Sequence, residues 1–169
     1  IFISILDQNG LFVHAQSIGS IERDYASEVD TDADNAIFVS GVYGGQADFD
    51  FGPDIKLHDV VGNQDLFVLK LSMDGTFQWS AAQGSVGNDA ALGIVADKEG
   101  NVVATGYYGG TIDMDPGPGV ANIISNGNTG VYVLKLTGNG EYLWAFGNEG
   151  GHGYDLAVDV LQNIYLTGS

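Results

Sequence analysis

Residues 66–71 of the chain read Leu-Phe-Val-Leu-Lys-Leu, and residues 131–136 read Val-Tyr-Val-Leu-Lys-Leu. The two stretches are 65 residues apart, and the same interval separates Trp79 from Trp144. Aligning residues 19–79 with residues 84–144 requires no gap and gives 21 identities in 61 positions. Because a fixed period of this length is typical of repeat architectures, the fold has to be worked out one repeat at a time.

Each repeat is predicted to contain four short β-strands. The 26 glycines fall between short apolar runs, a pattern typical of strands joined by turns. In the second repeat we expect strands at residues 92–96, 101–108, 131–136 and 141–146. A Gly-, Asp- and Pro-rich segment of about twenty residues separates the second strand from the third and reads as a loop.

The third strand of the repeat indicates how the sheets pack. Alternation places Tyr132 and Leu134 on one face of this strand and Val131 and Val133 on the other. A strand that is apolar on both faces must be covered on both faces, as in the four-stranded blades of a β-propeller. We therefore predict an all-β fold: a β-propeller, or a propeller segment, of four-stranded antiparallel blades with a 65-residue repeat. A β-solenoid and a β-sandwich are the alternatives.

The repeat boundaries divide the chain into four parts. Residues 1–18 match the third and fourth strands of a blade, residues 19–83 and 84–149 are whole blades, and residues 150–169 match the first and second strands. These parts amount to three blade equivalents, whereas propellers have about four to eight blades. We expect the rest of a larger protein, or other copies of the chain, to complete the ring.

The composition limits the partners. Five Lys and Arg residues against 22 Asp and Glu residues give a formal net charge of −17 at pH 7. A chain this acidic repels nucleic acid and anionic membrane surfaces, so we expect neither nucleic-acid binding nor direct membrane insertion. A hydrophobic content of 44% favours a folded chain. The chain has no cysteine, which excludes disulfides and thiolate metal sites.

Several of these stretches together resemble the bacterial β-propeller repeat family known as SBBP repeats. The resemblance rests on residues 65–71, Gly75, Trp79, and residues 84–89, 97–106 and 113–118. The last of these reads Asp-Met-Asp-Pro-Gly-Pro and is similar to the subgroup with Asp-Phe-Asp-Pro-Gly-Pro insertions. The sequence departs from the family pattern at His14, which stands where a Trp belongs. The resemblance implies an exported or cell-surface bacterial protein and implies no particular catalytic activity.

Two Asp-x-Asp-x-Gly-Pro stretches are candidate metal sites. They contain Asp48 and Asp50 in the first repeat, and Asp113 and Asp115 in the second. Alternate residues of an extended segment point the same way, and paired carboxylates with turn carbonyls suit Ca²⁺. Ca²⁺ is therefore the one candidate cofactor. The alternative is that these aspartates close turns and face solvent.

Four further residues are candidate ligand-facing positions. Tyr43 and Tyr108 are flanked by glycines beside the acidic insertion, and Asp24 and Asp89 recur in the loop that enters the first strand. Capping of backbone N–H groups is the alternative for the two aspartates.

Two other repeated pairs have structural interpretations. We expect Trp79 and Trp144 to pack between blades. Lys70 and Lys135 should pack their stems and direct their charges to an acidic surface.

Function is expected on the long loops of the rigid scaffold. The leading hypothesis is a non-enzymatic binding or adhesion module of a secreted or cell-surface bacterial protein. It would present acidic Gly- and Tyr-rich loops to a protein or a glycan, with Ca²⁺ as a candidate cofactor. The alternatives are a purely structural repeat scaffold of a surface assembly and a propeller enzyme acting on polysaccharide. An enzyme needs an acid/base constellation that the repeat does not duplicate, and no catalytic residue is assigned.

Overall fold

The computed structural model describes residues 1–169 except for the side chain of Asn128. Over this range the chain forms β-strands and turns, and none of the described residues forms a helix that could cross a membrane. The all-β prediction is confirmed. The strands are β1 (Phe2–Leu6), β2 (Phe12–Ser17), β3 (Tyr25–Thr31), β4 (Ile37–Tyr43), β5 (Ala47–Asp48), β6 (Leu57–His58), β7 (Asp65–Leu71), β8 (Phe77–Gln83), β9 (Ala90–Ala96), β10 (Val102–Asp113), β11 (Asn122–Leu136), β12 (Tyr142–Glu149), β13 (Gly153–Val158) and β14 (Ile164–Gly168).

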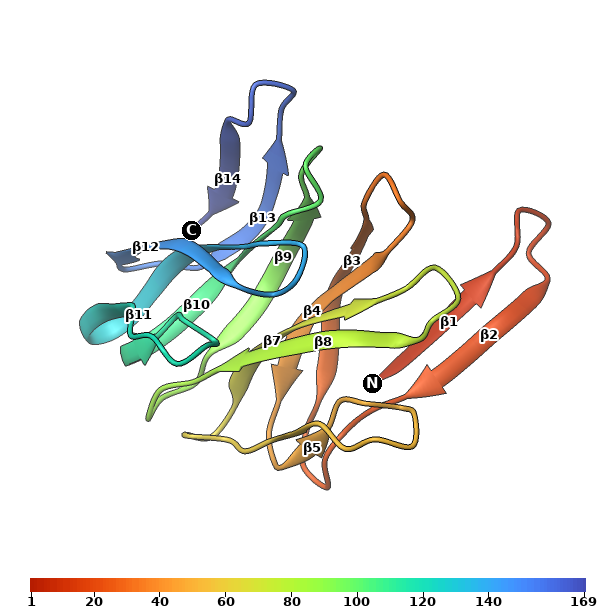
Figure 1. Ribbon diagram of the computed structural model, residues 1–169. Coiled ribbons are helices and arrows are strands. Elements are labelled where there is room, and N and C mark those ends of the chain that lie inside the picture. The colour runs from red at the N-terminus through yellow and green to blue at the C-terminus, as the bar shows by residue number, and fades with distance from the viewer.

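Two four-stranded antiparallel sheets form the centre of the molecule. The first has the strand order β3-β4-β7-β8, and the second has the order β9-β10-β11-β12. Ile37 pairs with Leu71 in the first sheet, and Val102 pairs with Leu136 in the second. The hairpins β1–β2 and β13–β14 are separate two-stranded sheets. Figure 1 shows the sheets following one another across the molecule, from the N-terminal hairpin in red to the C-terminal hairpin in blue.

The sheets share their irregularities as well as their strand order. The register shifts after Lys70 in the β7–β8 pair and after Lys135 in the β11–β12 pair. The β1–β2 hairpin has the same shift after Ile5. Such bulges increase the local twist of a strand pair. The hairpin β1–β2 therefore has the geometry of the third and fourth strands of the two sheets.

Apolar side chains fill the space between successive layers. Phe67 and Leu69 of β7 pack toward the β1–β2 hairpin with Ile1 and Ile3. From the other face of the same strand, Leu66 joins a cluster that spans both four-stranded sheets. A third cluster, which contains Val103, Val133 and Leu156, lies between the second sheet and the β13–β14 hairpin. The prediction that the third strand of each sheet is covered on both faces is confirmed.

The insertion between the second and third strands is β-structure, which corrects the expectation of a loop. In the second sheet β10 and β11 extend beyond the sheet as a long hairpin, with Asp113 opposite Asn122. In the first sheet the corresponding residues form the short pair β5–β6. The cause is a set of apolar residues between the aspartates: Ile112 and Met114 are fully buried in the central cluster, and Phe49 is buried in the N-terminal one. Burying a large apolar side chain contributes about 1.5–3 kcal/mol.

Candidate functional site

The aspartates of the Asp-x-Asp-x-Gly-Pro stretches close the tips of the insertions. Asp113 Oδ1 accepts hydrogen bonds from the backbone N–H groups of Asp115 (3.1 Å) and Ala121 (2.8 Å). Asp115 Oδ1 accepts a third from Gly117 N at 2.8 Å. These bonds are local side-chain-to-backbone bonds of the kind that stabilise turns.

The first insertion repeats the arrangement. Asp48 Oδ1 accepts from Asp50 N (3.1 Å) and Lys56 N (2.8 Å), and Asp50 Oδ1 accepts from Gly52 N (2.7 Å). Among the described residues, no group of three or more His, Cys, Asp or Glu side chains is placed to hold a metal ion. The geometry thus favours turn closure over Ca²⁺ binding for all four aspartates.

Replacing Asp113 with alanine is expected to lower the free energy of unfolding by about 1–2 kcal/mol, because two turn N–H groups lose their acceptor. Asp113→Asn keeps an acceptor oxygen and should cost less than half as much. Urea denaturation of both variants, repeated in calcium and in chelator, measures the effect. A calcium-dependent gain in stability that both variants lose would contradict turn closure and establish a metal site.

Asp24 and Asp89 cap the loops that enter β3 and β9. Asp89 accepts from Ser85 N at 2.6 Å and from Gly109 N at 2.9 Å. Asp24 makes the same two contacts one repeat earlier, at 2.6 and 3.0 Å. Asp89 is fully buried, and burial raises the pKa of its carboxyl although the N–H donors oppose the shift. The capping alternative therefore replaces the ligand-facing interpretation: the Asp89 carboxylate is out of reach of a ligand, and that of Asp24 is engaged by the loop.

Tyr43 and Tyr108 are core residues, so their assignment as ligand-facing was wrong. Both are buried. The Tyr43 hydroxyl donates to the carbonyl oxygen of Asp59 at 3.0 Å, and its ring meets Phe49 edge-on at 5.5 Å between centroids. Tyr108 belongs to the cluster between the two large sheets. The insertions fold back over both rings, which the glycines on either side of each tyrosine do not reveal.

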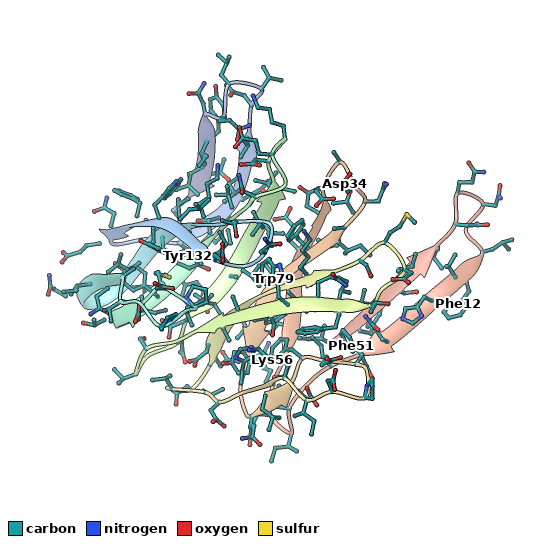
Figure 2. All side chains as sticks on the ribbon, viewed as in Figure 1. Phe12, Asp34, Phe51, Lys56, Trp79 and Tyr132 are labelled. Carbon is teal, nitrogen blue, oxygen red and sulfur yellow. The ribbon has the colours of Figure 1, made fainter. Side chains whose placement is uncertain are left out.

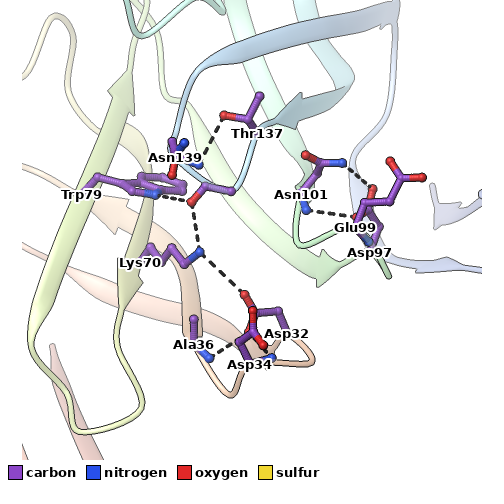
Figure 3. A network of polar contacts seen from close by, with 11 residues as sticks. Asp32, Asp34, Ala36, Lys70, Trp79, Asp97, Glu99, Asn101, Thr137 and Asn139 are labelled. Carbon is purple, nitrogen blue, oxygen red and sulfur yellow. Dashed lines mark hydrogen bonds and ion pairs between the residues drawn. The ribbon is translucent and has the colours of Figure 1, made fainter.

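One backbone carbonyl joins the two large sheets. Gly138 O, in the turn between β11 and β12, accepts from Trp79 Nε1 at 2.9 Å and from Lys70 Nζ at 3.0 Å (Figure 3). The Lys70 ammonium also lies 3.6 Å from Asp32 Oδ2. The expected packing of Trp79 between sheets is confirmed, and that of Trp144 is not, because Trp144 is 39% exposed.

Lys135 has its acidic partner within its own sheet. Its Nζ lies 2.7 Å from Asp97 Oδ2. Burial alone would raise the pKa of Asp97, but the bonds from Lys135, Asn101 and the turn N–H groups hold it below its usual value. Both lysines meet carboxylates, as the sequence predicted. The carbonyl shared by Trp79 and Lys70 could not have been predicted, because any residue type supplies such a group.

The same repeat positions line two surface grooves. The first, with a volume of about 320 Å³, is lined by residues 50–54 and 74–77 together with His14 and Gln16. The second, of about 490 Å³, is lined by residues 115–118 and 139–142 together with Trp79 and Ser80. Figure 2 labels one residue of each groove, Phe51 and Trp79. Each groove lies where an insertion tip meets the turn between the third and fourth strands.

Both grooves are acidic. The first contains Asp50, Asp54 and Asp74, and the second contains Asp115 and Glu141. Neither lining includes Lys or Arg. A groove with one sign of charge attracts groups of the opposite sign. The sequence analysis identified Asp50 and Asp115 but missed the grooves, because each one combines segments from different strand pairs.

Comparison with known proteins gives one similarity. The chain is 25% identical over 197 aligned residues to an uncharacterized WD repeat-containing protein, L264, of Acanthamoeba polyphaga mimivirus. The alignment covers 99% of this chain and 14% of that protein. No family model matches the chain. The similarity suggests a repeat protein of β-propeller type, since WD repeats form four-stranded propeller blades.

Proposed function

We propose that the chain is a β-propeller segment of 65-residue blades that acts as a non-enzymatic binding module. The groove that recurs at equivalent positions of two successive sheets carries this proposal. The strand pairs of the two sheets support the blade assignment, because Ile37–Leu71 and Val102–Leu136 are 65 residues apart. They also support the division at residues 18, 83 and 149. The resemblance to SBBP repeats assigns the module to an exported or cell-surface bacterial protein.

The charge of the grooves favours a basic polypeptide as the partner. Two or three carboxylates face each groove without a neighbouring cation in its lining, and the whole chain carries a net charge of −17. Electrostatic complementarity of this kind increases association rates and selects partners. A glycan partner would instead depend on the half-buried ring of Trp79, whose N–H is already committed to Gly138.

The experiment is titration of the chain with an oligolysine peptide at low and at physiological salt. Asp115→Asn/Glu141→Gln should weaken binding by roughly five- to tenfold, because two groove charges are removed. The control Glu22→Gln/Glu99→Gln removes two exposed charges elsewhere and should change the Kd by less than about twofold. Thermal melts show that both variants are folded.

Equal weakening in the two variants would contradict the groove as a site and would leave only a diffuse charge effect. Retention on a glycan array that Asp115→Asn/Glu141→Gln abolishes would keep the groove and replace the partner. If no ligand binds, the structural scaffold becomes the function to test.

A further inference from the structure

A ring-on-glycine contact holds successive sheets together. The Trp79 ring covers the turn glycine of the next sheet, Gly140, whose added Cβ would lie 2.8 Å from Trp79 Cδ2. His14 holds the same place over Gly75, at 2.7 Å. Gln16 reinforces that contact, because its Nε2 donates to Gly75 O at 2.8 Å. At both internal seams, the fourth strand of one sheet therefore places a ring on the turn of the next.

The two halves of a third such contact are exposed at opposite ends of the molecule. Trp144, which is 65 residues after Trp79, is 39% exposed. Gly10, which is 65 residues before Gly75, has no atom within 4 Å of its Cβ position. Gly10 has a φ of +77°, close to the +88° of Gly75, so its turn is already shaped to receive a ring.

The sheet edges show the same complementarity. β1 pairs with β2 alone, and β14 pairs with β13 alone, in the described chain. By repeat position β14 corresponds to β10, and β1 corresponds to β7 and β11. β10 and β11 are hydrogen-bonded neighbours. The unpaired edges of β14 and β1 are thus the two sides of a junction that both large sheets contain, and unpaired edges are ready templates for strand addition.

Apolar residues next to these edges are exposed where their repeat equivalents are buried. Phe2 is 78% exposed, whereas Phe67 and Tyr132 are fully buried. Tyr165 is 58% exposed, whereas Val103 is fully buried. Exposed apolar patches of this kind mark interaction surfaces.

We propose that the C-terminal hairpin of one copy and the N-terminal hairpin of a second copy form a composite sheet with the order β13-β14-β1-β2. Ile164 would pair with Leu6 of the second copy and Leu166 with its Ser4, by analogy with Val102–Leu136 and Ala104–Leu134. Trp144 would cover Gly10 of the second copy.

This inference rests on the blade assignment made above, but not on ligand binding. Each chain supplies two whole sheets and two half sheets. Two copies joined at both junctions would therefore close a ring of six blades, within the range of about four to eight that propellers use. A closed twofold arrangement satisfies both edges of both copies.

The first test is the mass of the chain in solution, measured by sedimentation equilibrium. We expect a two-copy species. Trp144→Ser should raise its dissociation constant by roughly tenfold or more, as truncation of a central Trp does in other interfaces. Leu143→Gln introduces the residue found at the equivalent position 78 and should change it by less than about threefold. A monomer at all accessible concentrations would overturn the proposal and would assign both edges to further repeats of a longer chain.

The second test fixes the register. Since the chain has no cysteine, Ser4→Cys chains mixed with Leu166→Cys chains can form disulfides only between copies. We expect rapid cross-linking of this pair and little of Ser4→Cys with Tyr165→Cys, because a one-residue shift points the side chain to the other face. Equal cross-linking of both pairs would overturn the proposal. In-register cross-links in assemblies larger than two copies would support the pairing and overturn the six-blade ring. Oligolysine binding is scored separately, so either proposal can fail alone.

Discussion

Gly106→Ala is expected to lower the free energy of unfolding by roughly 3 kcal/mol or more, or to prevent folding. An added Cβ at this position would overlap the carbonyl oxygen of Ala90 on the neighbouring strand β9. The overlap is with backbone, so no side-chain rotation can relieve it. The register shift between Thr105 and Gly106 brings the two strands this close. Urea denaturation measures the loss, with circular dichroism to report whether the variant folds.

The same substitution elsewhere gives the controls. Gly41 occupies the equivalent position in the first sheet, where an added Cβ would overlap Tyr25 O and the Phe67 ring. Gly41→Ala should therefore be about as harmful as Gly106→Ala. Gly109→Ala places its Cβ 3.5 Å from Gly87 Cα, an ordinary contact, and should cost less than about 1 kcal/mol. Equal losses at Gly106 and Gly109 would show that the close approach of β9 and β10 is wrong.

Asp89→Ala is expected to lower the free energy of unfolding by about 3 kcal/mol, because Ser85 and Gly109 are left with buried, unpaired N–H groups. Asp24→Ala removes the same two bonds at a partly exposed site and should cost about 1 kcal/mol. The comparison isolates the effect of burial, since the bond lengths agree within 0.1 Å (2.6 and 2.9 Å against 2.6 and 3.0 Å). Chemical denaturation at neutral pH measures both. A larger loss at Asp24 than at Asp89 would contradict the buried cap.

A neighbouring carboxyl belongs to the same buried region. Asp65 is buried at the start of β7 and accepts from Val61 N at 2.7 Å. Burial raises its pKa to about 6, and the nearby Asp89 adds to the shift. The folded state therefore binds a proton here that the unfolded state has already lost, between the ordinary Asp pKa and about pH 6. This group favours unfolding as the pH rises through that window.

Much of the strand layout could be predicted from the sequence, because the 65-residue period and the two-sided apolar pattern of β7 and β11 are both visible in it. The bulges after Lys70 and Lys135 could not, since they depend on how the hairpin twist is accommodated. The insertion was misinterpreted for a related reason. Its Gly, Asp and Pro content is typical of loops, yet Ile112 and Met114 bury enough apolar surface to keep it in the sheet.

The site was predictable only in part. The aspartates of the insertions were identified by their repetition, but their hydrogen bonds to turn N–H groups depend on the path of the backbone. Tyr43 and Tyr108 were placed at a surface because their neighbours are glycines, which carry no information about what packs above a ring. The grooves and the carbonyl shared by Trp79 and Lys70 arise between sheets, beyond the reach of a pattern within one repeat.

The most direct test of two equivalent, stacked sheets is a set of NMR cross-strand and inter-sheet NOEs. The structure predicts backbone NOEs between Val39 and Leu69 and between Ala104 and Leu134, the equivalent pairs of the two sheets. It also predicts NOEs from the Trp79 indole to Gly140, across the seam. Pairing of Ala104 with a neighbour of Leu134, or a Trp79 ring without contacts to Gly140, would contradict the stacked repeat.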